Sequence, residues 1–446
     1  MNCVFTIVAK NYLAMALTLG DSLAKVHPEY DFKIFLADES DETIRGFLSK
    51  YQIIEVKDIG IENWKDLAFK YDVSEFSTSI KPFCFEYLVN ESNYTNLMYF
   101  DPDIYIFNQL SIIEERLRDH FCVITPHASD LEIEWSGAVP EENSLISGVF
   151  NLGFIAFRNN DQSRFVFRWW KEKLRRKCYL ERLEGLFYDQ NWIQFLASSF
   201  HEDVCVLKDY GFNVAWWNLH ERIVEYQGEI PTILHKGDRT QHKCVFFHFS
   251  GFNVLDRTVI NSRYRKNPFF VLKHQPDLSR LFNEYADRVV ANGHGPLKNL
   301  DYKFNHFENG FVVTKLHRRI YKELTSKDIG YRNMDGVRRS LMARIQSIQL
   351  IFENPFSTEM GSFYALMNEN GLIIKSGKLA IDNLNPDRDG EMYNNKIIMA
   401  TKIMKFFKKC IGIKNYISIL KFLNLYTRDE YQLFLLDLTK HDFRKP

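Results

Sequence analysis

Residues 97–107 have the sequence LMYFDPDIYIF, and the rest of the chain is organised around this stretch. Its first four residues are apolar and predict a buried strand, while Pro102 lacks the N–H needed for a ladder hydrogen bond and indicates that the strand leaves the sheet there. Residues two apart on an extended backbone point to the same side, so Asp101 and Asp103 can converge on one point. Paired carboxylates are suitable ligands for Mg²⁺ or Mn²⁺. The alternative to a metal site is that Asp-Pro-Asp starts a solvated turn.

The segments before and after this stretch alternate between two patterns. Short apolar runs rich in β-formers predict strands, and apolar residues at helical spacing predict helices. Alternation of this kind indicates a mostly parallel, doubly wound α/β sheet, whose ligand crevice lies beyond the carboxyl ends of its strands. We expect strands at 3–9, 32–37, 53–56, 97–100, 122–125 and 148–157, and helices at 11–26, 42–50, 79–89, 164–177 and 188–200.

Composition narrows the class of protein. The chain has 446 residues, which is longer than a single hydrophobic core usually supports. Its net charge of zero does not favour nucleic-acid binding. Seven scattered cysteines without a Cys-x-x-Cys pair indicate reduced thiols rather than disulfides or a zinc site. The first residues lack the basic and apolar regions of a signal peptide, and no apolar run is long enough for a bilayer. We therefore expect a cytoplasmic protein.

Three regions are expected from the change of character along the chain. Residues 1–262 form the sheet domain, and residues 263–390 form a mainly helical accessory region, with further helices expected at 278–290, 313–324 and 337–351. Residues 391–446 form basic amphipathic helices, because positions 392–427 contain seven lysines among apolar residues and no acidic residue. Such helices can lie on the anionic inner face of a membrane; a solvated charged face over a small helical core is the alternative.

Five motifs in order resemble the nucleotide-sugar glycosyltransferases of the GT-A fold, a Rossmann-like fold, and in particular the glycogenin and lipopolysaccharide galactosyltransferase group, family eight. The resemblance covers roughly residues 1–253. The motifs are a first strand running into Asn11-Tyr12, then Asp101-Pro102-Asp103, Phe150-Asn151-Leu152-Gly153, Asp189-Gln190 and His248-Phe249-Ser250-Gly251.

The resemblance implies a role for each motif. Asp101, Asp103 and His248 would hold Mn²⁺ or Mg²⁺ on the diphosphate of a UDP-sugar donor. Asn151, Asp189 and Gln190 would lie beside the transferred sugar as the catalytic group. The donor would be contacted by a further set of residues, namely Thr6, Ile7, Val8, Asn11, Asp38, Lys81, Gly153, Ser250 and Gly251.

Four of these residues have a structural alternative. His248 could be a core histidine, Lys81 a surface lysine, Asp189 a helix cap and Gly251 a turn. The chain also departs from the family pattern. Ala9-Lys10 replaces the acidic residues before the first Asn, and Asn253-Val254-Leu255 stands where a Lys-Pro-Trp is common, leaving Arg257 as a substitute cation.

The favoured hypothesis is a metal-dependent glycosyltransferase that transfers a sugar, with retention, to a cell-envelope polysaccharide or a lipid-linked oligosaccharide. Its partners would be the donor, a glycan or lipid-linked acceptor, and the anionic membrane surface, with no nucleic acid. A sugar-1-phosphate nucleotidyltransferase is the first alternative, although no Gly-rich basic loop follows Val8. A non-catalytic carbohydrate-binding scaffold is the second.

Overall fold

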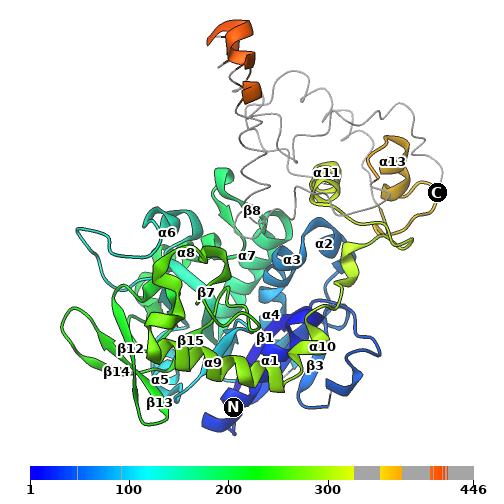
Figure 1. Ribbon diagram of the computed structural model, residues 1–446. Helices are drawn as coiled ribbons and strands as arrows, with labels where there is room; N and C mark the ends of the chain where they lie inside the picture. The colour runs from blue at the N-terminus through cyan, green and yellow to red at the C-terminus, as the bar shows by residue number, and fades with distance from the viewer. Residues whose placement is uncertain are drawn as a thin grey trace. The chain divides into compact units, whose positions relative to one another are not determined.

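The computed structural model describes residues 1–325 except 48 and 92, residues 352–373, and residues 402–404, 406–413, 415, 416 and 419. It divides into two compact units (Figure 1). The first contains residues 1–64 and 73–303, and the second contains residues 65–72 and 304–446.

A seven-stranded sheet in the order β10-β6-β7-β4-β1-β2-β3 forms the centre of the first unit. β1, β2, β3 and β4 are parallel, whereas β7 runs antiparallel between β4 and β6. The predicted class, a mostly parallel α/β sheet, is confirmed. The strands are β1 (Asn2–Val8), β2 (Asp31–Leu36), β3 (Gln52–Glu55), β4 (Asn96–Phe100), β6 (Cys122–Pro126), β7 (Phe150–Arg158) and β10 (Val204–Val206).

Helices bury their apolar stripes against this sheet. In α1, Leu13, Ala16, Leu17 and Leu23 recur at helical spacing and are at most 2% exposed, so the stripe faces the core. The other helices of this unit are α3 (Val73–Ser79), α4 (Lys81–Glu91), α5 (Ser111–Asp119), α6 (Glu142–Ser147), α7 (Asp161–Lys177), α8 (Gln190–Ser199), α9 (Pro276–Ala291) and α10 (His294–Leu297), with α1 at Leu13–Val26.

The first unit extends beyond the boundary expected at residue 262. α9 carries a buried apolar stripe, and the ring of Tyr285 stacks on Phe249 with centroids 3.8 Å apart. α9 also packs against α1 (Figure 1). Because this stripe joins the core of the sheet domain, residues 263–303 belong to the same compact unit.

A second, small sheet brings distant parts of the chain to the end of β4. β15 (Phe246–His248) pairs antiparallel with β5 (Ile104–Ile106) and parallel with β11 (Val214–Ala215). The remaining strands are the antiparallel β12 (Arg222–Gln227), β13 (Ile230–His235) and β14 (Gln241–Lys243), and the pair β8 (Leu180–Glu181) and β9 (Leu186–Phe187).

The prediction of a helix at 42–50 was wrong. The described residues there form turns and one 3₁₀ turn, Arg45–Phe47. Asp41 explains this difference in part. Its carboxylate accepts hydrogen bonds from the backbone N–H of Thr43 and from the ammonium of Lys10, which favours a local turn.

The second unit has an aromatic core of its own. The Phe69 ring of α2 (Trp64–Lys70) lies 4.8 Å from the Tyr321 ring of α11 (Lys315–Thr325) and 5.2 Å from the Phe363 ring of α13 (Phe363–Glu369). The buried Arg318 donates to the carbonyls of Ala68, Phe69 and Tyr71. The helix expected at 337–351 and most of the basic region 391–446 lie outside the described residues.

Candidate functional site

Asp101, Asp103 and His248 meet at the carboxyl end of β4. The backbone fixes the loop that carries both aspartates, because Asp101 donates its N–H to the Gly153 carbonyl at 2.7 Å and the Asp103 carbonyl accepts the N–H of Phe249 at 2.8 Å. His248 Nε2 lies 3.0 Å from an Asp103 oxygen and 3.7 Å from an Asp101 oxygen. One ligand atom from each of the three residues lies within 4.8 Å of the others. This geometry suits a shared cation.

Gly153 makes room for the imidazole. A Cβ at this position would lie 2.5 Å from His248 Cε1, so even alanine would displace the ring. Burial lowers the pKa of His248, but the carboxylates of Asp103 and Asp101 more than offset this and raise it overall. Burial raises the pKa of Asp101, although Lys81 and His248 oppose that effect. Two carboxylates and one imidazole therefore fit a divalent metal such as Mn²⁺, which would replace the proton on this site.

A buried ion pair lies behind the carboxylates. The Lys81 ammonium is 2.6 Å from an Asp189 oxygen, and the two side chains are only 1% and 4% exposed. Lys81 also donates to the Leu152 carbonyl at 3.0 Å and lies 4.1 Å from the centroid of the Tyr99 ring. Burial raises the pKa of Asp189, while Lys81 opposes the rise. Lys81 is therefore no surface lysine, and Asp189 makes no side-chain cap to α8.

The amino end of β7 lies at the same edge as the carboxyl ends of the parallel strands, because β7 runs antiparallel to β4 and β6. This places Asn151 in the site, where its amide contacts His127 Nε2 at 3.3 Å and accepts the Gly153 N–H at 3.1 Å. Gln190 fixes the strand from α8, accepting the Leu152 N–H at 3.0 Å and donating to the Ser147 carbonyl.

The residues assigned to the nucleotide lie along β1 and its neighbours. Thr6, Ile7 and Val8 are buried in β1, and the Thr6 hydroxyl has no partner among the described residues. Asn11 follows in a 3₁₀ turn and is partly buried. Asp38 accepts the N–H groups of Lys10, Glu39 and Lys303, so its carboxylate is largely occupied by backbone donors.

Ser250 and Gly251 lie one residue beyond the end of β15. Gly251 has a φ of 75°, a conformation that glycine adopts without strain, and a Cβ there would lie 2.7 Å from the Asn261 amide. The loop is held because the Gly251 carbonyl accepts both the N–H and the hydroxyl of Ser262. The roles of these residues in binding a nucleotide stay predictions.

Three residues in the site were not found from the sequence. The Tyr99 hydroxyl donates to an Asp101 oxygen at 2.6 Å, His127 contacts Asn151, and the Trp217 ring lies edge-on to His248 with centroids 5.1 Å apart. Tyr99 had a usable signal, because it lies two residues before Asp101 on a strand and shares its face. His127 follows the carboxyl end of β6, the position at which ligand residues gather. Burial lowers the pKa of His127 to about 4, so it is neutral at pH 7.

Tyr99→Phe is expected to weaken Mn²⁺ binding about tenfold, because the hydroxyl orients one of the metal ligands. Isothermal titration with Mn²⁺ in the presence of UDP measures the effect. Tyr94→Phe is a matched control, since Tyr94 is equally buried and donates at 2.6 Å to Asp31, away from the site. Equal affinities for the two variants would show that Tyr99 does not position Asp101.

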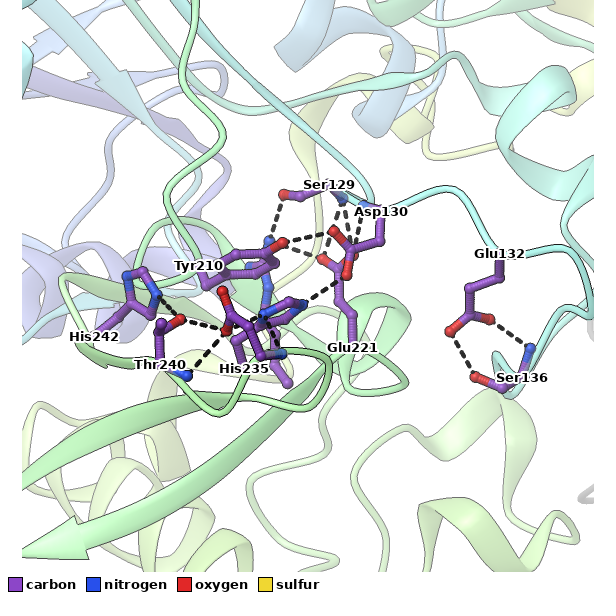
Figure 2. Close-up of polar contacts among 11 residues, drawn as sticks. Ser129, Asp130, Glu132, Ser136, Tyr210, Glu221, His235, Thr240 and His242 are labelled. Carbon is purple, nitrogen blue, oxygen red and sulfur yellow. Dashed lines mark hydrogen bonds and ion pairs between the residues drawn. The ribbon is translucent and has the colours of Figure 1, made fainter.

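A second polar cluster anchors the segment between β6 and β7 (Figure 2). The Glu221 carboxylate accepts the N–H groups of Ser129 and Asp130. Asp130 in turn contacts the Tyr210 hydroxyl at 2.6 Å and His235 Nε2 at 2.7 Å. The first residues of the segment are thus tied to the loop before β12 and to the end of β13.

His235 carries a charge in this cluster. Its Nδ1 lies 2.7 Å from Asp238 and its Nε2 lies 2.7 Å from Asp130, and only an imidazolium donates from both nitrogens. Burial lowers the pKa of His235, but the two carboxylates more than offset it and raise the pKa above 6.5.

His235→Gln is expected to reduce the free energy of unfolding by about 1 kcal/mol at pH 6, and by less as pH rises. The sign follows from the raised pKa, because the stabilisation is fully present below the unfolded-state pKa near 6.5 and is lost as pH rises through the folded-state value. Urea unfolding of both proteins between pH 6 and pH 9 measures the difference. His274→Gln serves as control, because His274 is exposed and lies outside this cluster. A pH-independent loss in His235→Gln would contradict the ionic explanation.

No protein-family model matches this chain. The chain is 24% identical over 302 residues to the uncharacterised protein YfnF of Bacillus subtilis strain 168, a match that covers 64% of this chain and 97% of YfnF.

Solved glycosyltransferases are similar to this chain. The galactosyltransferase LgtC, solved with donor and acceptor sugar analogues, is 17% identical over 64% of this chain and 95% of LgtC, with a TM-score of 0.39. The glycosyltransferase GlyE of Streptococcus pneumoniae TIGR4 is 14% identical over 69% of this chain and 66% of GlyE, with a TM-score of 0.36. Mouse xyloside xylosyltransferase 1 is 12% identical over 56% of this chain and 98% of that protein, with a TM-score of 0.35.

Proposed function

We propose that this protein is a metal-dependent glycosyltransferase that uses a UDP-sugar as donor. The observation that carries the proposal is the convergence of Asp101, Asp103 and His248 at the carboxyl edge of an α/β sheet. That edge is where ligands bind in open α/β sheets. The cluster joins two carboxylates of one loop with an imidazole from a strand far along the chain, so it is more than a solvated Asp-Pro-Asp turn.

Mn²⁺ or Mg²⁺ held by these three residues would neutralise the charge that develops on the leaving UDP. The chain's own residues have separate tasks. The backbone of Thr6, Ile7 and Val8 with Asn11 would contact the nucleoside, and the N–H groups around Gly251 would approach the diphosphate. Asp38, whose carboxylate receives backbone donors, would fix the loop after β2 rather than contact the donor itself.

Asn151, Asp189 and Gln190 would surround the transferred sugar. Lys81 pairs with Asp189 at 2.6 Å and opposes the rise in the Asp189 pKa that burial causes. An anion beside the anomeric carbon would stabilise an oxocarbenium-like transition state. The Gln190 amide accepts the N–H of Leu152 in β7 and donates to the Ser147 carbonyl. Gln190 would therefore position the neighbouring Asn151 and Gly153. We propose transfer with retention on the basis of the family resemblance.

The acceptor would be a cell-envelope polysaccharide or a lipid-linked oligosaccharide, and the protein would work at the inner face of the membrane. Among the described residues, no helix combines the length and apolarity needed to cross a bilayer. In the basic region, the described residues Ile403, Phe406 and Ile413 are more than half exposed. Lys408 and Lys409 lie among them, as a surface helix for an anionic membrane requires.

Thermal shift with a panel of ligands tests the proposal. UDP and UDP-sugars are expected to raise Tm only with Mn²⁺ present, while other nucleotides give smaller shifts. Stabilisation by a nucleoside triphosphate together with a sugar phosphate would favour a nucleotidyltransferase instead. Stabilisation by glycans alone, without nucleotide or metal, would favour a carbohydrate-binding scaffold.

A further inference from the structure

α7 and α8 present a surface of exposed aromatic rings. Phe165 of α7 is 52% exposed and Phe195 of α8 is 55% exposed. The partly exposed Trp169 and Trp192 connect the two helices, since their ring centroids are 6.4 Å apart and each lies within 6.4 Å of the Phe195 ring. Large exposed aromatic patches mark contact with a protein or a membrane. We call Phe165, Trp169, Trp192 and Phe195 the aromatic face.

The same face carries three cations, Arg168, Lys173 and Arg176, against one anion, Glu172, which lies 3.9 Å from the Arg176 guanidinium. α7 contains seven Lys or Arg residues and only two acidic ones, and α8 contains no charged residue. At helical spacing, positions 165, 168, 169, 172, 173 and 176 of α7 lie on one side, opposite the buried Val166, Trp170 and Leu174. Arg168 and Arg176 are exposed there, and the Lys173 ammonium lies 5.6 Å from the centroid of the Trp192 ring. The aromatic rings are therefore bordered by cations.

We propose that the aromatic face of α7 and α8 docks on an anionic lipid surface. Amphipathic aromatic rings favour the interface between headgroups and acyl chains, and Lys and Arg beside them are attracted to anionic lipids. A bilayer surface accommodates aromatic rings and neighbouring cations together, whereas Lys is depleted at most protein–protein interfaces. The inference is independent of the metal site and concerns a part of the chain other than the basic C-terminal region.

The position of the aromatic face connects it with catalysis, and this link alone rests on the proposed function. α8 begins at Gln190, whose amide supports β7 beside the candidate site. At about 1.5 Å rise per residue, Trp192 and Phe195 lie only about 3 Å and 8 Å further along the helix axis. Docking through this face would bring the site close to the headgroup layer, where a lipid-linked acceptor is held.

Vesicle binding of the full chain tests the proposal. The protein is expected to co-sediment with phosphatidylcholine vesicles that contain phosphatidylglycerol, and to bind pure phosphatidylcholine vesicles far less. Phe195→Ser combined with Arg168→Glu should weaken binding at least about tenfold, because a ring is lost and a cation becomes an anion. Ile230→Ser combined with Lys243→Glu is the matched control, since both residues are exposed on the sheet β12–β14.

Tryptophan quenching locates the contact. Brominated phosphatidylcholine in the anionic vesicles should quench the fluorescence of the bound protein, and Trp169→Phe with Trp192→Phe should remove most of this quenching. The sequence has no tryptophan after Trp217, so contact through the C-terminal region alone would not be quenched. Sedimentation of the patch variant like wild type, bound protein without quenching, or no vesicle binding by the wild type would each overturn the proposal. Metal-dependent hydrolysis of a UDP-sugar reports separately on the proposed function and should be unchanged in the patch variant.

Discussion

Asp103→Asn is expected to reduce the metal-dependent release of UDP from a UDP-sugar by at least about a thousandfold. An Asp103 oxygen lies 3.0 Å from His248 Nε2, whereas the nearest Asp101 oxygen lies 3.7 Å away. Asp103 is therefore the aspartate that pairs more closely with the histidine. An amide keeps the shape of the side chain but lacks the charge that binds a divalent cation. Coupled-enzyme detection of UDP with Mn²⁺, and the same assay with EDTA, measures the effect.

Asp238→Asn is the matched control for this substitution. Asp238 also pairs with a histidine, His235, at 2.7 Å, but it belongs to the cluster that anchors the segment after β6. Its loss should leave UDP release within about twofold of wild type, while circular dichroism confirms that both variants are folded. Full activity of Asp103→Asn would contradict the proposed metal site.

Lys81→Met is expected to have the largest effect on stability, about 3–5 kcal/mol of the free energy of unfolding. Removing the cation leaves Asp189 buried without its ion-pair partner, and the Leu152 carbonyl also loses its donor. Urea unfolding measures the loss. Arg45→Met is the control for an exposed pair, because Arg45 and Glu42 are 73% and 75% exposed, and it should change stability by less than about 0.5 kcal/mol.

A double substitution separates stability from activity. Lys81→Met with Asp189→Leu removes both charges, and a buried pair replaced by apolar residues of similar size recovers much of the lost stability. Activity should stay absent, because the carboxylate beside the transferred sugar is gone. Recovery of activity together with stability would show that the pair has a structural role only.

The fold was predictable where local sequence carries the signal. β1, β2, β4 and β6 are short apolar runs, and their strand type follows from that pattern. The direction of β7 was not predictable, because an apolar run carries no sign of its orientation, and its pairing with β4 and β6 depends on the whole sheet. The extension of the first unit to Lys303 likewise depends on the packing of α9 on α1.

The candidate site shows the same division. Asp101 and Asp103 could be paired from strand geometry alone, but the approach of His248 required the motif resemblance, since β15 is more than 140 residues away along the chain. The ion pair between Lys81 and Asp189 joins two helices and left no local signal. Trp217 left no local signal either. Tyr99 and His127 were missed although their positions, two residues before Asp101 and directly after β6, were visible in the sequence.

Anomalous diffraction from crystals grown with Mn²⁺ and UDP tests the central claim most directly. We expect one strong manganese peak at bonding distance from Asp101, Asp103 and His248, with the diphosphate completing its coordination. A manganese peak elsewhere in the chain, or UDP bound without manganese between these three side chains, would contradict it.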